Sequence, residues 1–172
     1  MSDPAGGRSI PDPGFAGDDG SADPAVAAAL VAWSAGEVTR ADVIGALQRS
    51  RLLVPVVAVL GEVEYDEAGL AHDKTSDMAT VLLQGADGRL ALLAFTGTAE
   101  LVAWNPEGRP VPVPARLAAR SALQDGAEAL VIDVAGPVRF VVEGEDLHGL
   151  AHGWRLTRVG SGTAWIRPSD PA

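Results

Sequence analysis

The stretch Thr80–Trp104 constrains the fold more than any other part of the chain. Its sequence, TVLLQGADGRLALLAFTGTAELVAW, places an apolar run on each side of Asp87-Gly88. Glycine accepts a positive φ and aspartate hydrogen-bonds its own backbone, so this dipeptide favours a tight hairpin turn. The residues Thr96-Gly97-Thr98 interrupt the second run, and Thr98 is placed to cap a short helix. The stretch predicts strand, turn, strand and helix, but no pattern in it names a reaction.

The residues before this stretch predict two helices and a buried strand. Asp23 is a favoured N-cap with proline at the first helical position, and Thr39 begins a second helix with an acidic residue three positions later. The run Leu52–Leu60, LLVPVVAVL, lacks alternation and indicates a strand covered on both faces. Pro55 within it has no N–H to donate, which predicts an edge or a bulge on one side at that point.

The residues after this stretch complete an α+β arrangement. Apolar patterns predict two helices and three strands, at 114–124, 129–134, 138–142, 144–151 and 153–159. The predicted fold class is α/β in the α+β sense. It has a mixed sheet of about five strands with two hairpins, an N-terminal helix pair and two or three further helices. The domain is expected over 23–159, between a disordered tail, 1–22, and a flexible tail, 160–172, both rich in Gly, Pro and Ser.

Charge and composition exclude several classes of protein. The chain of 172 residues has a formal net charge of −10, which opposes binding to nucleic acid and to anionic membranes. It contains no cysteine, so disulfides, thiolate nucleophiles and Cys-ligated metals are excluded. No apolar run approaches the ~20 residues of a membrane span, and the first residues lack an apolar signal core. A cytoplasmic location is therefore expected.

Motifs for chemistry are missing from the sequence. It has no phosphate-binding loop, no dinucleotide fingerprint, no serine elbow and no zinc-protease helix, so neither a cofactor nor a metal site is predicted. His148 and His152 are four residues apart and would share one face of a helix. Gly149 stands beside the first histidine, where the metalloprotease pattern needs glutamate, so both imidazoles are expected to face solvent.

The polar connection 61–78 is the preferred candidate for a binding surface. Lys74 is the only lysine in the chain, and it can pair with Asp73 or Asp77 or present its amine to an anionic ligand. We predict a non-enzymatic domain that binds or regulates another protein through this connection and the helix that ends near Trp104. The alternative is a small-molecule- or metal-dependent enzyme using the same two aspartates and Lys74, with His72. A homodimer that pairs sheet edges is a third possibility.

Several short strings, taken in order, resemble one known family. They are Ala46-Leu47, Leu52–Val56, Asp87–Arg89, Ala94–Thr96, Leu101, Trp104, Ala129–Asp133, Gly136-Pro137, Phe140–Val142 and Leu147. Over about residues 25–152, the chain resembles the N-terminal domain of the SseB family, the enhanced serine sensitivity proteins, and Lys74–Met78 resembles the version found in actinobacteria. The resemblance implies an α/β domain and brings no catalytic residues or cofactor with it. Some members carry a second, C-terminal domain, which a chain of this length is not expected to contain.

Overall fold

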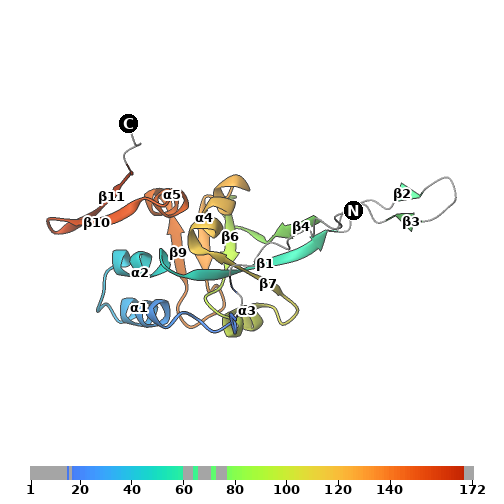
Figure 1. The fold of residues 1–172 in the computed structure, drawn as a ribbon, viewed down its shortest axis with the longest axis horizontal. Helices are drawn as coiled ribbons and strands as arrows, with labels where there is room; N and C mark the ends of the chain where they lie inside the picture. Colours follow the sequence, from blue (N-terminus) through green and yellow to red (C-terminus); the bar gives the residue numbers. More distant parts are fainter. Residues whose placement is uncertain (1–14, 16, 60–63, 66–70, 73–76, 169–172) are drawn as a thin grey trace, which may run out of the picture.

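A four-stranded sheet forms the centre of the protein (Figure 1). The computed structural model describes residues 15, 17–59, 64–65, 71–72 and 77–168. The strand order of the central sheet is β5-β6-β8-β9, in which β6 and β8 are parallel and the outer pairs are antiparallel. The strand bounds are β5 (Leu82–Gln84), β6 (Leu90–Ala94), β8 (Ala129–Ile132) and β9 (Phe140–Glu143). Gly88 has a φ of +83°, which confirms the predicted turn between β5 and β6.

A three-stranded antiparallel sheet adjoins the first through a single bridge, Leu53 with Phe95. Its order is β4-β1-β7, with bounds β4 (Asp77–Thr80), β1 (Arg51–Val59) and β7 (Arg109–Pro114). Pro55 lies between that bridge and the first β4 pair, Val56 with Thr80. On this side of β1, Pro55 therefore has no β-ladder partner. Proline has no N–H to donate, so this agrees with the edge or bulge that the sequence predicts. A separate short pair joins β2 (Glu64–Tyr65) to β3 (Ala71–His72).

Local capping residues fix the ends of several helices. The helices are α1 (Pro24–Ser34), α2 (Arg40–Leu47), α3 (Thr98–Trp104), α4 (Ala115–Gln124) and α5 (Gly144–His152). The Asp23 carboxylate accepts a hydrogen bond from the Ala25 N–H at 2.8 Å, and Asp42 forms a capping box with Thr39. Both features confirm the sequence prediction. The predicted cap of α3 is wrong by one residue, because Gly97 is the N-cap and the Thr98 N–H donates to the Gly20 carbonyl at 2.8 Å.

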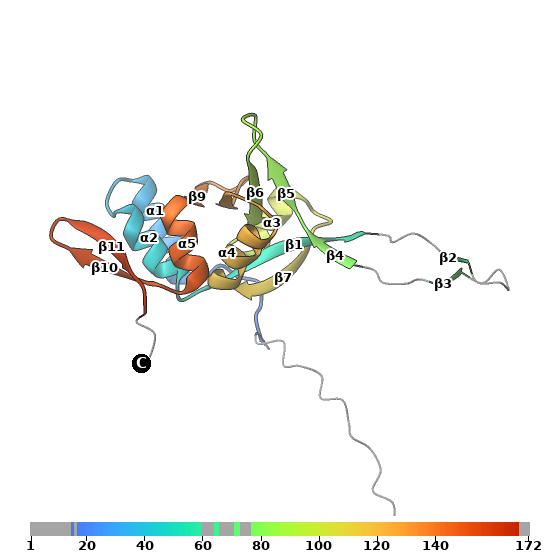
Figure 2. The same ribbon diagram turned by 90° about the horizontal axis from the view of Figure 1, so that it is seen from above.

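Helices cover the two faces of the central sheet unequally. Four helices, α1, α2, α4 and α5, pack on one face with Leu92, Leu130 and Phe140. In Figure 2, α1, α2 and α5 lie side by side in this layer. The short α3 packs on the other face through Leu101 against Phe95 and its neighbours. The α+β class predicted from the sequence is confirmed, although in the part of the chain that the structure describes seven strands in two bridged sheets replace the single sheet of about five.

The C-terminal stretch contradicts one sequence prediction. The sequence predicts a flexible tail over 160–172, yet β11 (Gly162–Ile166) pairs with β10 (Arg155–Val159) as a hairpin. The Trp165 ring lies against Gly149 of α5, and its indole N–H donates to Asp146 at 3.0 Å. The turn and this contact order residues 160–166. Among the described helices, none combines the length and apolar character needed to cross a membrane.

Candidate functional site

Asp133 and Thr96 meet at the carboxyl edge of the parallel strands. Thr96 follows β6 after Phe95, and Asp133 follows β8 directly. The Thr96 backbone N–H and hydroxyl each donate to a different oxygen of the Asp133 carboxylate, both at 2.8 Å. Thr96 is 4% exposed and Asp133 is 3% exposed. The carboxyl edge of parallel strands is where open α/β sheets commonly bind ligands, so the pair lies at a favoured position.

The backbone of Asp133 is strained. Its φ is +53°, and no other non-glycine residue in the described part of the chain has a positive φ. Such a conformation is uncommon outside glycine, although Asp tolerates it better than most residues. The Gly136 N–H donates to the Asp133 carbonyl at 2.9 Å, and a Cβ on Gly136 would lie 3.0 Å from the Asp133 Cβ. The tight turn therefore holds the carboxylate in one position.

Burial changes the ionisation of Asp133. Desolvation raises the pKa of its carboxyl to about 6, against the lowering effect of the two Thr96 hydrogen bonds. The nearby Glu100 carboxylate of α3 raises the pKa further. No Lys, Arg or His among the described residues forms an ion pair with Asp133. The site therefore carries a buried acid without a basic partner in the described part of the chain.

A small cavity of about 90 Å³ lies against this acid. Its polar lining comes from Thr96, Glu100 and Asp133. The rest is apolar and comes from α1, from the residue before its cap and from the loop before β9: Ala22, Ala27, Leu30, Val31, Pro137 and Val138. The lining of the cavity thus combines two acidic residues with hydrocarbon side chains.

Residues 17–22 lie across the edge of this site, which corrects the predicted disordered tail 1–22 in its described part. The Arg51 guanidinium pairs with Asp18 and also donates to the Ser21 and Thr96 carbonyls. A Cβ on Gly97 would lie 2.9 Å from the Ala22 backbone nitrogen, so the two segments touch closely. The composition of 1–22 is typical of a disordered tail. The residue that orders 17–22 is Arg51, which lies too far along the sequence for a local pattern to reveal it.

Of the candidate residues taken from the sequence, Trp104 is the one whose side chain the structure describes, and it does not line the cavity beside Asp133. Asp73 and Lys74 are outside the described residues, whereas Asp77 begins β4. Trp104 ends α3 and is partly buried, with its ring centroid 5.5 Å from that of Phe95.

The two histidines of α5 do share one face. Their ring centroids are 6.1 Å apart, and His152 Nδ1 lies 2.8 Å from the His148 carbonyl oxygen. Over the residues that the structure describes, no group of three or more His, Asp or Glu side chains is arranged to hold a metal ion.

Sequence reasoning missed Thr96, Glu100 and Asp133 as site residues. Two signals were available: an apolar strand that ends directly in an acid, Ala129–Asp133, and a second strand that ends in Thr96. The parallel pairing that joins them was not evident, because each strand also belongs to a hairpin.

The fold and this edge site define an α+β domain with a mixed central sheet. A model of the SseB protein N-terminal domain family matches residues 26–149. The chain belongs to the SseB family through this domain, which confirms the resemblance seen in the sequence. The match ends before the β10–β11 hairpin. No curated protein and no solved structure matched the chain.

Proposed function

We propose that this SseB-type domain is a non-enzymatic protein-binding module that takes up a lysine side chain of its partner at Asp133. The observation that carries the proposal is the buried Asp133 carboxylate beside a cavity, with no basic partner among the described residues. A buried charge without a partner is costly, and an inserted ammonium group would offset that cost.

The number of hydrogen-bond acceptors left free at Asp133 supports binding of a cation. An ionised carboxylate offers about four acceptor positions, and Thr96 uses two at Asp133. Glu100 supplies a second carboxylate at the same cavity. A lysine ammonium brings three donors and no acceptor, which complements these two acids.

The size and lining of the cavity support lysine over arginine. Lysine buries its methylene stem along apolar surface while its charged tip reaches a polar group. The aliphatic walls from Leu30 and Val138 suit such a stem. A volume of about 90 Å³ favours one unbranched side chain over a planar guanidinium.

The test compares partner capture by the full-length wild-type chain and by Asp133→Asn. Asparagine tolerates the positive φ and still accepts from the Thr96 N–H, so the variant removes the charge with little change in shape. Exposed Glu107, in the α3–β7 loop, provides the matched control as Glu107→Gln. Immobilised proteins are incubated with native lysate at pH 7.5, and captured proteins are quantified by mass spectrometry.

We expect Asp133→Asn to lose a partner that the wild type and Glu107→Gln retain. Acetylating the lysines of the lysate should remove the same partner. The proposal fails if Asp133→Asn keeps every captured protein, or if lysine acetylation has no effect. Displacement of the partner by n-butylamine at millimolar concentration would give independent support, whereas tight uptake of the free amine alone would indicate a small-molecule site instead.

A further inference from the structure

The C-terminal part of the domain carries charge of the opposite sign to the rest. Residues 147–168 contain no aspartate or glutamate, although the whole chain has 23 acids and a formal net charge of −10. The same residues contain three arginines and two histidines. This segment covers the end of α5 and the whole β10–β11 hairpin. A net positive surface therefore lies on a strongly acidic protein.

Neighbouring elements add arginines to this surface. The helix α4 carries Arg116 and Arg120 one turn apart and has no acid. A Cβ on Gly153 would lie 3.1 Å from the Arg116 Cδ, so that side chain runs beside the junction of α5 and β10. Gln48 donates from Nε2 to the Trp154 carbonyl at 2.7 Å, which brings the end of α2 and its neighbour Arg49 to the same place.

A stacked row of rings and cations crosses this surface. The His148 and His152 rings lie 6.1 Å apart, and the His152 and Trp154 rings lie 5.4 Å apart at 26°. The Arg167 guanidinium carbon, just after β11, lies 4.4 Å from the centroid of the Trp154 ring, just before β10. Such stacking holds the guanidinium in place while its N–H groups stay free to donate.

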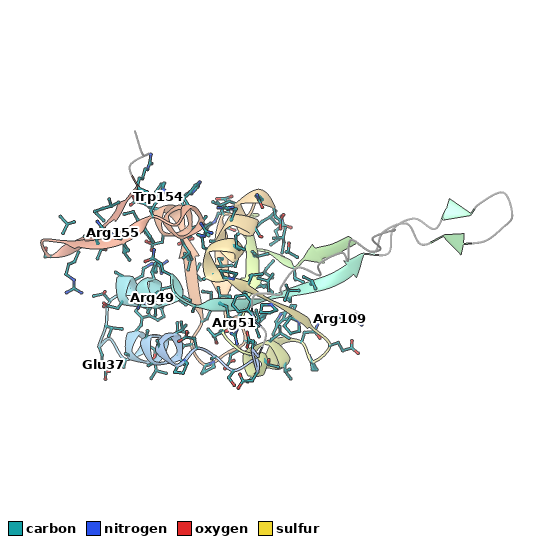
Figure 3. All side chains as sticks on the ribbon, in the orientation of Figure 1. Glu37, Arg49, Arg51, Arg109, Trp154 and Arg155 are labelled. Carbon is teal, nitrogen blue, oxygen red and sulfur yellow. The ribbon has the colours of Figure 1, made fainter. Side chains whose placement is uncertain are left out.

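We define the cationic face as Arg49, Arg116, Arg120, His152, Arg155 and Arg167, all of which are exposed. None of these arginines forms an ion pair with another described residue. The nearby acids Asp42 and Asp146 are engaged by Arg158 and Arg40 respectively. In Figure 3, Arg49, Trp154 and Arg155 lie toward one end of the protein, far from Arg109.

We propose that the cationic face binds an acidic segment of a partner protein. Exposed arginines pair with carboxylates in a bidentate manner, and the stacked row offers apolar area beside them. Surface charges act over a Debye length of about 8 Å at physiological ionic strength, so a carboxylate at this face responds mainly to the local arginines. A nucleic acid is disfavoured because its extended line of phosphates would meet the acidic remainder of the protein. None of these residues lines the Asp133 cavity, so the inference is independent of the function proposed above.

The test measures binding of a short fluorescein-labelled peptide of alternating Glu and Ala to the full-length protein by fluorescence anisotropy. A peptide with Gln in place of Glu is the neutral probe. The variants Arg155→Glu and Arg116→Glu reverse one charge each on the cationic face. Arg109→Glu makes the same change at the distant, exposed Arg109 and serves as the matched control.

We expect the Glu peptide to bind and the Gln peptide not to bind. Each reversal on the cationic face should weaken binding about tenfold, while Arg109→Glu leaves the affinity within about twofold. Added salt should weaken binding of the Glu peptide. Asp133→Asn should bind the peptide as the wild type does, which separates this result from the test of the cavity.

Three results would overturn the assignment. The first is that the Glu peptide does not bind, or that Arg109→Glu weakens its binding as much as the reversals on the cationic face do. The second is equally tight binding of a single-stranded DNA of the same charge. The third is a wild-type dimer in analytical ultracentrifugation that Arg155→Glu dissociates, because a second copy would then occupy the face. Thermal melts check that each variant folds. If Arg155→Glu does not fold, Arg155→Gln takes its place in the test.

Discussion

Arg51 donates to both carboxylate oxygens of Asp18, at 2.5 and 2.9 Å, across 33 residues of sequence. This hydrogen-bonded pairing holds the pKa of the Asp18 carboxyl below its ordinary value and raises the pKa of Arg51. Arg51 also donates to Ser21 and Thr96, so one side chain joins the segment 17–22 to the edge of the site.

The first prediction concerns this contact. Changing Arg51→Met should release residues 17–22 and lower the free energy of unfolding by about 1–3 kcal/mol, since Asp18 and the carbonyls of Ser21 and Thr96 lose their donor. Limited proteolysis with mass spectrometry should find new cleavage before α1. Arg51→Lys keeps the charge but lacks the forked donors, so it should restore only part of the protection. Unchanged proteolysis in Arg51→Met would show that other contacts hold the segment.

The second prediction concerns the dependence of stability on pH. The pKa of Asp133 is raised from 3.8 to about 6 in the folded state, so the folded protein holds this proton more tightly than the unfolded chain. The resulting stability is present below pH 4 and is lost as pH rises through 6, by about 3 kcal/mol at most. Carboxyls with lowered pKa values, such as Asp18 and Asp42, act in the opposite direction.

The measurement is therefore a difference between the wild type and Asp133→Asn. Urea unfolding at intervals from pH 4 to pH 8 gives the free energy of unfolding of each. We expect Asp133→Asn to gain stability relative to the wild type as pH rises through 6 and to level off above pH 7. A constant difference across this range would mean that Asp133 titrates as an ordinary carboxyl.

The third prediction separates the backbone role of Asp133 from its charge. Asp133→Ala should cost about 2–4 kcal/mol, because alanine is strained at a φ of +53° and the Thr96 N–H loses its acceptor. Asp133→Gly relieves the strain and still removes the acceptor, so it should cost less. Thermal unfolding of the two variants checks this order. If both variants lose the same stability, the lost hydrogen bond accounts for the whole effect and backbone strain for none of it.

The fourth prediction concerns the attachment of the β10–β11 hairpin. A Cβ on Gly149 would overlap the Trp165 ring, so Gly149→Ala should displace Trp165 from Asp146 and cost about 1–3 kcal/mol. Tryptophan emission should shift to longer wavelength as the indole becomes more exposed. Gly45→Ala is the matched control, because Gly45 lies in α2 with open space around its Cβ position. That change should raise stability by about 0.5–1 kcal/mol.

Local features of the fold could be predicted from the sequence. The Asp87-Gly88 turn and the Asp23 cap depend on neighbouring residues, and the structure confirms both. The Thr96–Asp133 hydrogen bonds join residues 37 apart, so no local pattern reveals them. The β10–β11 turn at Gly160 has a positive φ of 59°, but its Gly- and Ser-rich composition is shared by flexible tails.

We expect the parallel pairing of β6 with β8 to form later in folding than the two hairpins that it joins. The β5–β6 and β8–β9 hairpins each close over a short loop, whereas register between Leu93 and Val131 requires a much longer loop to close. Closing a long loop costs more chain entropy than closing a short one, so we expect Asp133 to reach Thr96 only after both hairpins exist. Pulse-labelling by hydrogen exchange during refolding should therefore protect the amide of Thr96 after those of β5 and β9.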